Sequence, residues 1–499
     1  MRTSRVAVIG AGVAGLVTAL ELAAQGLDVT VIERAATPGG KMREVAIGDA
    51  RIDAGPTVFT MRWVFEEVFA AAGASLADHV TLLPAETLAR HAWSDHERLD
   101  LFADVDRSAD AIGTFAGAAE AKGYRAFAER ARQIYRTVEG PFIRNARPSP
   151  LALVRDGGIG GLNGLWSIAP FATMWRELGT YFHDPRLRQL FGRYATYCGS
   201  SPFLAPATLM LIAHVEQDGL WLVEGGMHQV AVAIARLAEA RGATFRYGQE
   251  AAEVLTAGGR VTGVSLTTGE RIDADAVVVN ADFAAVAAGR LGRGIAGAVP
   301  KVARSARSLS AVTWSLVAET EGFPLLRHTV FFSRDYPAEF NDIFRLGRLP
   351  AEPTVYICAQ DRNDSGAFPG GPERLLCLVN APAEGDARLF DASEIEQCER
   401  RTFALLTRCG LTVHRRPEAT VVTTPTQFDQ MFPGTGGALY GLAQHGWKAS
   451  FSRPGAKTKI PGLYLAGGSA HPGAGVPMAA LSGRIAAATL LADRASTTR

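Results

Sequence analysis

The 499-residue sequence predicts an α/β fold in which a parallel sheet covered by helices is interrupted by two large insertions. Three observations support this prediction. The N-terminus reads as strand, glycine turn, helix and strand. The last forty residues read as strand, glycine-proline loop and helix, and the chain between carries several runs rich in β-branched and aromatic side chains.

The N-terminal segment RVAVIGAGVAGLVTALELAAQGLDVTVIER predicts a nucleotide site. Residues 6–9 are continuously apolar, as a strand buried on both faces requires, and a helix is expected over residues 13–24. The G-x-G-x-x-G turn between them lets backbone approach a pyrophosphate, which the first helical amides would bind. The second strand closes with Glu33, whose carboxylate is placed to bind a ribose diol. The dinucleotide contacts predicted here are Gly10, Gly12, Val13, Ala14, Gly15, Glu33 and Arg34.

The residues that follow favour FAD over NAD. ATPGGKMRE resembles the Gly-Gly-Arg/Lys turn that flavin amine oxidases and their relatives carry after this unit, where the turn lies along the flavin diphosphate. Lys41 or Arg43 would then face phosphate, and the alternative is an exposed turn with solvated cations. The cofactor contacts predicted in this turn are Gly39, Gly40, Lys41 and Met42.

The C-terminal segment GLYLAGGSAHPGAGVPMAALSGRIAAATLLADR agrees with a flavin site. It reads as a buried strand over residues 463–466, a glycine-proline loop, and a helix from about residue 477 to 493. Flavoproteins of this class close their nucleotide domain with such a returning strand. The start of the helix would stabilise negative charge on reduced flavin. The contacts predicted here are Gly467, Gly468, Gly475, Val476, Pro477 and Met478.

A third segment is expected to complete the flavin domain. A glycine pair at 225–226 opens an apolar helix, a strand ends near Arg246, and a hairpin turns at residues 258–259. A buried strand follows over residues 276–279. In relatives, the strand that corresponds to the one holding Val254 offers its backbone to adenine. The predicted FAD-binding domain is therefore discontinuous, with segments 1–60, 220–285 and 430–499.

Two insertions are assigned to the substrate. Residues 61–219 look helical and rich in aromatic side chains, and we expect them to face substrate or membrane. Residues 286–429 contain the β-rich runs and predict a mostly antiparallel sheet. Within the first insertion, the stretch Ser149–Trp175 is apolar and glycine-rich. It fits either a patch that lies on a bilayer surface or a loop folded over the substrate cavity.

Composition narrows the classes of function. Lys and Arg total 51, Asp and Glu total 50, and the net charge of +1 argues against a nucleic-acid-binding protein. The five cysteines form no CxxC pair, so we predict no metal site. The N-terminus imitates a signal peptide but shows no cleavage site, and no other stretch is long and apolar enough to span a membrane. We expect a cytoplasmic protein that associates peripherally with the inner membrane.

Four motifs resemble the bacterial-type carotenoid desaturases, the phytoene desaturase family. They are VIGAGVAGL…VIER…PGGK, DAGPTVFTM at residues 53–61, ADAVVVNAD and LYLAGGSAHPGAGVPMAALSG. The resemblance extends over essentially the whole chain. It implies an FAD-binding Rossmann-like domain of the amine-oxidase/phytoene-desaturase type, with an inserted substrate-binding antiparallel sheet and a helical lid. It adds Gly55, Pro56 and Thr57 to the expected cofactor contacts.

Within the family, LARHAW and DPRLRQLFGRYATYCGSSPFLAPATL are most similar to the 1-hydroxycarotenoid 3,4-desaturases of purple phototrophic bacteria. That resemblance implies carotenoid biosynthesis, with a substrate such as 1-hydroxyneurosporene, a new C3–C4 double bond, and hydride transfer to flavin. Oxygen and a quinone both fit as the final electron acceptor. The chain departs from the common family pattern at residues 467–470 and at Met478, which bears on the fine geometry of the substrate site.

Two residues are candidates for catalysis. A strong base is not required, because developing positive charge would be delocalised into the polyene. His471, in the loop beside the predicted flavin edge, is the candidate acid–base residue, and the alternative is that it shapes the loop. Glu224 is the second candidate, with structural pairing as its alternative. Replacing His471 with alanine is expected to retain FAD and to lose desaturation.

Other functions are not excluded by these motifs. A phytoene desaturase or a carotenoid isomerase of the same family would share them, as would another flavin amine-oxidase-type enzyme. An amine oxidase usually needs an aromatic cage near the flavin, and the C-terminal block offers only Tyr464 and small residues. A binding protein that has lost its flavin, like the prenyl-GTPase dissociation inhibitors, is disfavoured because the glycine motifs and Glu33 are intact.

Overall fold

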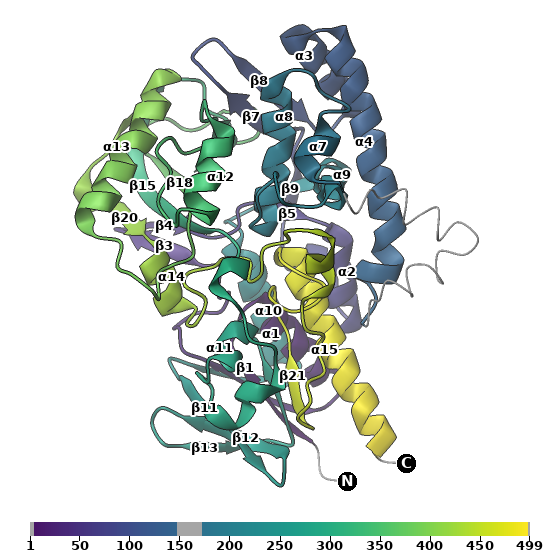
Figure 1. The fold of residues 1–499 in the computed structure, drawn as a ribbon. Helices are drawn as coiled ribbons and strands as arrows, with labels where there is room; N and C mark the ends of the chain where they lie inside the picture. Colours follow the sequence, from purple (N-terminus) through teal and green to yellow (C-terminus); the bar gives the residue numbers. More distant parts are fainter. Residues whose placement is uncertain (1–3, 147–171, 498–499) are drawn as a thin grey trace.

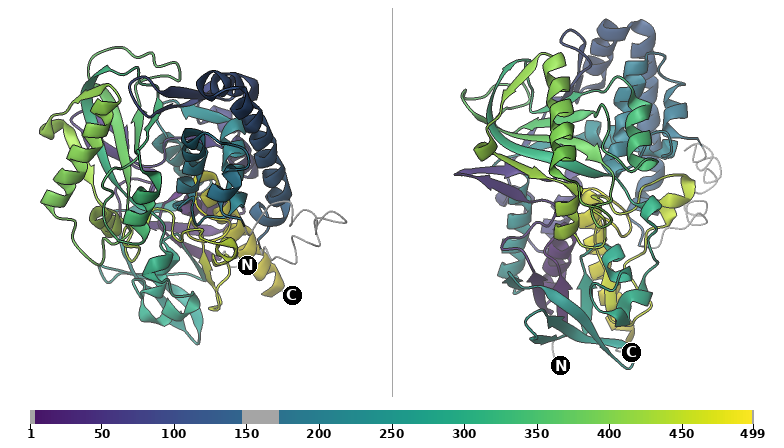
Figure 2. Two further views of the ribbon diagram at one scale, coloured as in Figure 1. Left: turned by 45° about the horizontal axis from the view of Figure 1, so that its top comes forward. Right: turned by 60° about the vertical axis from the view of Figure 1, so that its left-hand side comes forward.

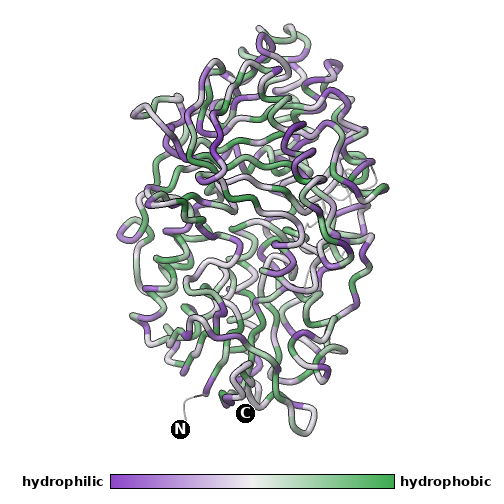
Figure 3. The backbone as a smooth tube through the Cα atoms, turned by 90° about the vertical axis from the view of Figure 1, so that its left-hand side faces the viewer, coloured by the Kyte–Doolittle hydropathy of each residue, from purple (hydrophilic) through white to green (hydrophobic). Residues whose placement is uncertain are grey.

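The structure, a computed structural model, describes residues 4–146 and 172–497. Most of the stretch Ser149–Trp175, for which a bilayer patch or a cavity loop was expected, lies outside these residues. Both termini lie at one end of the molecule, next to the parallel sheet, and a large sheet and a group of helices form the other end (Figure 1, Figure 2). Hydrophobic stretches run through both halves (Figure 3).

Among the described residues, a parallel sheet of five strands forms the base of the nucleotide domain. Its strands in spatial order are β10 (Thr244–Tyr247), β2 (Asp28–Glu33), β1 (Arg5–Ile9), β14 (Ala276–Val279) and β21 (Leu463–Leu465). The first, middle and last parts of the chain therefore meet in one sheet. Four consecutive residues of β14 are buried, as expected for a strand covered on both faces.

Three helices form the layer beside this sheet: α1 (Val13–Ala24) packs on β1 and β2, and α10 (His228–Ala240) and α15 (Val476–Thr497) pack on α1. The bounds of α1 confirm the sequence prediction, and α15 extends further at its C-terminus than expected. α15 lies against α1 (Figure 1), and the Thr18 hydroxyl donates to the carbonyl oxygens of Ala14 at 2.8 Å and Gly483 at 3.0 Å. A Cβ atom at Gly483 would lie only 2.4 Å from the Ala14 oxygen. The two helices approach this closely because Gly483 has no side chain.

Replacing Gly483 with leucine is therefore expected to destabilise the protein by about 1–3 kcal/mol, because α15 must move away from α1 to admit the side chain. The measurement is the midpoint of urea unfolding, followed by circular dichroism. Gly297→Ala is the control, since a Cβ atom there meets nothing within 4 Å. Equal midpoints for the two variants would contradict the close contact.

A second large sheet runs through the upper half of Figure 1. Its strands in order are β19 (Leu411–His414), β15 (Ser310–Gly322), β18 (Glu373–Ala381), β17 (Val355–Ala359), β16 (His328–Phe331), β7 (Thr87–Ala92) and β8 (Arg98–Phe102), and β20 (Thr420–Thr423) pairs with β15. The pairs are antiparallel except β16–β7, which is parallel. β7 and β8 come from the insertion expected to be helical. That insertion therefore also supplies part of the substrate-side sheet.

The other described strands form smaller sheets. They are β3 (Glu44–Ile47) with β4 (Ala50–Asp53), then β5 (Phe59–Thr60) with β9 (Leu220–Val223) and β6 (Leu82–Pro84), and finally β11 (Ala251–Ala257), β12 (Arg260–Leu266) and β13 (Arg271–Asp273). The hairpin turn predicted at residues 258–259 is confirmed, because Ala257 pairs with Arg260 and both glycines have positive φ.

The remaining described helices flank the sheets or pack on other helices, for example α3 on β8 and α4 on α9. They are α2 (Arg62–Ala71), α3 (Val105–Ala116), α4 (Ala118–Val138), α7 (Met174–Leu178), α8 (Pro185–Gly192), α9 (Leu211–Asp218), α11 (Phe283–Ala287), α12 (Tyr336–Phe344), α13 (Ala392–Arg408) and α14 (Pro425–Met431), with short turns that include η2 (Glu139–Ile143), η4 (Arg193–Cys198), η5 (Ala207–Met210) and η9 (Trp447–Phe451). Across residues 4–146 and 172–497, no helix combines the length and apolar character needed to cross a membrane. The same residues contain no His, Cys, Asp and Glu group suited to a metal ion.

Candidate functional site

The two glycine turns predicted to hold a diphosphate lie against each other. Gly39 donates its backbone N–H to the carbonyl oxygen of Ala11 at 2.8 Å, and Gly12 forms a parallel bridge with Gly39. A Cβ atom at Gly40 would lie 3.1 Å from Cα of Gly12. At Gly12, Gly39 and Gly40 the two turns therefore bring backbone without side chains to the start of α1.

The start of α1 fits the phosphate and hydroxyl groups of FAD. Gly12 precedes the helix without a side-chain cap, so the first amides have no side-chain acceptor. Oδ1 of Asn280 is buried there and has no hydrogen-bond partner among the described residues. A Cβ atom at Gly12 would lie 2.7 Å from this oxygen. An uncapped helix start binds phosphate, and an unpaired amide oxygen accepts from a hydroxyl group, so the residues present fit the cofactor.

Glu33 is positioned for a ribose and is also part of the turn. Its Oε2 accepts the N–H of Ala11 at 2.6 Å, and its Oε1 accepts the N–H of Ala35 at 2.8 Å. The side chain is nearly buried. Because an ionised carboxylate has about four acceptor sites, Glu33 retains sites for two ribose hydroxyls.

Lys41 and Arg34, two of the three predicted cations of this region, are bound by carbonyl oxygens of the chain, and Nη2 of the third, Arg43, donates to the Thr423 hydroxyl at 3.2 Å. Nζ of Lys41 donates to Leu439 at 2.6 Å, and burial lowers the pKa of this amine. Nη2 of Arg34 donates to the carbonyl oxygen of Gln430 at 2.7 Å. Both side chains thus connect the N-terminal segment to residues 430–439. Their contact with a diphosphate stays a prediction.

Two further predicted contacts are buried side chains. Met42 is in the main hydrophobic core. Val254 lies on β11, outside the parallel sheet, and its N–H donates to the carbonyl oxygen of Leu291 at 3.0 Å. The N–H of Val254 is thus already bonded within the chain, and the predicted contact between the backbone of this strand and adenine stays a prediction.

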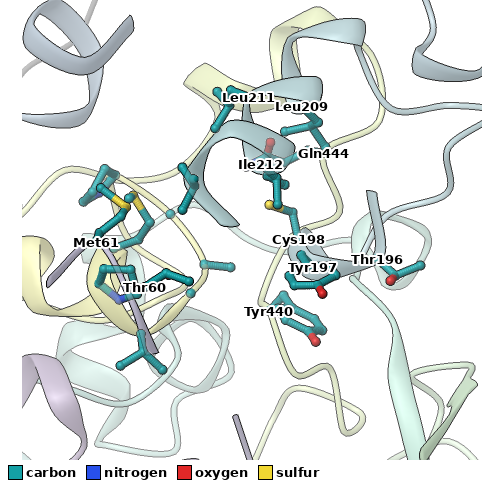
Figure 4. A pocket seen from close by; sticks show the side chains of 18 of the residues that line it. Thr60, Met61, Thr196, Tyr197, Cys198, Leu209, Leu211, Ile212, Tyr440 and Gln444 are labelled. Atoms are coloured by element: carbon teal, nitrogen blue, oxygen red, sulfur yellow. The ribbon is translucent and has the colours of Figure 1, made fainter. Parts of the chain in front are cut away.

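A cavity of about 610 Å³ joins the C-terminal loop to the DAGPT segment. Gly55, Pro56 and Thr57 line it together with residues 472–478. The predicted contacts Gly475, Val476, Pro477 and Met478 therefore meet the other three in space. Most other lining is apolar: Val58, Met61, Val138, Phe142, Ile143, Leu209, Leu211, Ile212, Val215 and Leu378. Figure 4 shows Met61 and Thr60 across the cavity from Tyr197 and Tyr440.

Gly467 and Gly468 lie behind this lining and are held by the chain. The Gly467 N–H donates to the Ser482 hydroxyl at 3.1 Å. The carbonyl oxygen of Gly468 accepts from Nη1 of Arg453 at 2.7 Å, and Nη2 of Arg453 donates to Tyr440 at 3.0 Å. Arg453 is buried, and sequence reasoning missed it because its partners are backbone carbonyl groups in loops, which no side-chain pattern marks.

Neither predicted catalytic side chain is among the cavity-lining residues. Nε2 of His471 lies 2.8 Å from the carbonyl oxygen of Asn145, and the ring of Phe142 contacts the imidazole edge-on. Burial lowers the pKa of His471. Glu224 is exposed and borders a separate, charged pocket of about 240 Å³ near Asp53. His471 therefore contacts the segment that carries Phe142 and Asn145, and Glu224 lies outside the cavity lining; their catalytic roles stay predictions.

The polar lining of the cavity was not anticipated. Arg193 is the one charged side chain among the described lining residues, and its Nη2 donates to the Tyr197 hydroxyl at 3.2 Å. Tyr197 and Tyr194 donate to the buried carboxylate of Glu216 at 2.8 Å and 2.5 Å. Tyr356 also lines the cavity. The segment RYATY carries a signal for part of this cluster, because its arginine and second tyrosine are four residues apart.

Comparison with protein families gives a match over nearly the whole chain. The model for "Flavin containing amine oxidoreductase" matches residues 13–491. The hydroxyneurosporene desaturase of Rubrivivax gelatinosus is 58% identical over 500 residues, covering 100% of this chain and 95% of that protein. The hydroxyneurosporene desaturase of Cereibacter sphaeroides is 46% identical and covers 99% of both chains.

A solved structure shows the same fold. An oxidoreductase from Methanosarcina mazei aligns with a TM-score of 0.61 at 17% identity, covering 96% of this chain and 99% of the other. At that identity the likeness concerns the arrangement of the elements alone.

Proposed function

The chain belongs to the flavin containing amine oxidoreductase family, and we propose that it is an FAD-dependent carotenoid desaturase. Its substrate is a 1-hydroxylated acyclic carotenoid, into which it introduces a C3–C4 double bond. The observation that carries this proposal is the apolar cavity, which is lined by the predicted flavin contacts at residues 55–57 and 475–478. The names of the two relatives at 58% and 46% identity support the substrate class.

The residues of the cavity orient the polyene and keep water from it. When bound, FAD supplies the two-electron oxidation, because it accepts a hydride. The substrate also loses a proton from the neighbouring carbon, which leaves the new double bond. No carboxylate or imidazole is among the described lining residues, so the proton passes to a hydroxyl or amide oxygen or to water. These weak bases suffice because the polyene delocalises positive charge.

We propose that His471 is a positioning residue. Its imidazole holds η2 and the residues that follow it against the loop that lines the cavity, through Phe142 and Asn145. Loss of this support shifts the polyene relative to the cofactor, and small misplacements lower turnover strongly.

His471→Ala is expected to retain FAD and to lower turnover by about tenfold to a hundredfold. His471→Gln is expected to recover most of the turnover, because a glutamine amide can donate to the Asn145 carbonyl as Nε2 does. Flavin absorbance and product formation are measured for both variants. A glutamine variant as inactive as the alanine variant would favour the acid–base role predicted from the sequence.

The cavity mouth supports a peripheral position on the inner membrane, facing the cytoplasm. Trp447 lines the cavity and is 39% exposed, and the neighbouring Leu204 is 48% exposed. The Lys448 ammonium lies 5.6 Å from the centre of the Trp447 ring. Exposed apolar side chains beside a cation suit the surface of a bilayer, from which a lipid-soluble polyene would enter.

The test of the proposed function uses FAD-loaded protein and liposomes that contain either 1-hydroxyneurosporene or phytoene. A product two hydrogens lighter, formed from the hydroxylated polyene, is expected; unchanged mass indicates an isomerase, and reaction of phytoene alone indicates a phytoene desaturase. Parallel assays with oxygen and with a quinone identify the electron acceptor. Protein that fails to float with empty liposomes contradicts the membrane position.

A further inference from the structure

Three polar side chains, linked by hydrogen bonds, lead to the cavity wall beside the predicted flavin contacts. The Tyr356 hydroxyl lies 2.6 Å from Oγ1 of Thr57 and 2.8 Å from Nδ1 of His328. His328 pairs with Cys358 across β16 and β17, so His328 and Tyr356 are diagonal neighbours on one face of the sheet. Thr57 and Tyr356 line the cavity, and His328 lies buried behind them.

The positions of the protons on His328, Tyr356 and Thr57 determine whether the Thr57 hydroxyl can donate a hydrogen bond into the cavity. Burial lowers the pKa of His328 to about 3, so its imidazole is neutral and carries one N–H. Nε2 of His328 is buried without a partner among the described residues. An unpaired acceptor is less costly than an unpaired N–H, which places the proton on Nδ1. His328 then donates to Tyr356, and Tyr356 donates to Thr57.

The Thr57 hydroxyl consequently has a proton of its own to donate. The nearby thiol of Cys358 is only a weak acceptor. A hydroxyl donor without a strong acceptor in an apolar cavity is energetically unfavourable. A ligand oxygen beside Thr57 would accept its hydrogen bond and remove that cost. The oxygen need not be charged, because a single hydroxyl donor suits a neutral acceptor.

We propose that Thr57 and Tyr356 bind the tertiary hydroxyl group of the substrate, and that His328 is a positioning residue that sets the direction of their hydrogen bonds. This inference rests on the proposed function. In a 1-hydroxylated polyene one methylene separates the hydroxyl-bearing carbon from C3, so the hydroxyl must lie beside the reacting carbons. Thr57 directly follows Gly55 and Pro56 and therefore lies at the flavin end of the cavity.

The other polar cluster of the cavity is less suited to this role. The Tyr197 hydroxyl already donates to Glu216 at 2.8 Å and accepts from Arg193 at 3.2 Å. Its proton is thus committed to a buried carboxylate. A substrate hydroxyl that displaced this bond would leave Glu216 short of a donor.

The test compares Tyr356→Phe with Tyr336→Phe in the FAD-loaded enzyme. The substrates are 1-hydroxyneurosporene and 1,2-dihydroneurosporene, which has hydrogen in place of the hydroxyl group. Tyr336 is a matched control, because its hydroxyl is buried without a partner among the described residues and it does not line the cavity. Dissociation constants are measured from the polyene absorption with the flavin reduced beforehand, so that no desaturation occurs, and kcat/KM with oxidised flavin and an electron acceptor.

The preference ratio is the affinity, or the kcat/KM, for 1-hydroxyneurosporene divided by that for 1,2-dihydroneurosporene. Wild-type protein and Tyr336→Phe are expected to have the same ratio, in favour of the hydroxylated polyene. Tyr356→Phe is expected to lower this ratio at least about tenfold, in both binding and kcat/KM, through the hydroxylated polyene alone. An unchanged ratio, or equal losses for both polyenes, overturns the inference. Wild-type protein that desaturates neither polyene, or both equally, overturns the proposed function instead.

His328 is tested by the same ratio. An asparagine at this position keeps an N–H near the place of Nδ1, whereas a leucine has none. His328→Leu is expected to lower the preference for the hydroxylated polyene, and His328→Asn to restore it. A leucine variant with an unchanged ratio overturns the positioning role.

Discussion

Replacing Gly15 with alanine is expected to abolish FAD binding. The added Cβ atom would lie 2.1 Å from the carbonyl oxygen of Gly10 and 2.8 Å from Oδ1 of Asn280. Neither neighbour can move freely. Gly10 has a φ of +100° and donates its N–H to Ile32 at 2.8 Å, and Nδ2 of Asn280 donates to Ala466 at 2.8 Å. The turn must therefore open, which displaces the amides at the start of α1 that are predicted to bind the diphosphate.

The measurement is absorbance near 450 nm in the purified protein, with circular dichroism to show that the variant folds. Gly297→Ala serves again as the control, because it adds the same methyl group where there is room. A folded Gly15→Ala variant that purifies with a full content of flavin would show that the cofactor binds elsewhere.

The nucleotide-binding unit could be predicted from the sequence because its signals are local. Apolar strand, glycine turn and helix lie within thirty residues, and the predicted helix over residues 13–24 coincides with α1. The pairing of β7 with β16 could not be predicted in this way. These strands are short and more than two hundred residues apart in sequence. Their register depends on contacts that no local pattern encodes.

The candidate site shows the same division. Gly55–Thr57 and the C-terminal loop could be identified from motifs, and the structure brings them to one cavity. Tyr356 carries no motif, because its role depends on Thr57 and His328, which lie on other segments. For His471 the sequence located the loop but not the direction of the side chain. That direction depends on Asn145, more than three hundred residues away.

The sheet that carries Tyr356 is stabilised by a buried ion pair beyond the end of β17. Arg362, which follows β17, binds both carboxylate oxygens of Glu373 at 2.7 Å. Glu373 begins β18 and is fully buried, and the Thr320 hydroxyl on β15 also donates to it, at 2.5 Å. The pair thus joins three strands of the sheet.

Glu373→Ala is expected to destabilise the protein by about 3–5 kcal/mol, because the guanidinium of Arg362 stays buried without its counter-ion. Replacing both residues with leucine is expected to cost less than this single change, since no unpaired charge is then left. Glu396→Ala is the control, because its 3.8 Å pair with Arg400 is exposed and is expected to change stability little.

Urea unfolding followed by circular dichroism measures all three variants. If Glu373→Ala unfolds at the same urea concentration as Glu396→Ala, the buried pair does not hold the sheet. Because β17 carries Tyr356, we also expect Glu373→Ala to weaken the preference for the hydroxylated polyene at temperatures where the variant is still folded. The leucine pair, which keeps the strands packed, is expected to retain that preference more fully than Glu373→Ala does.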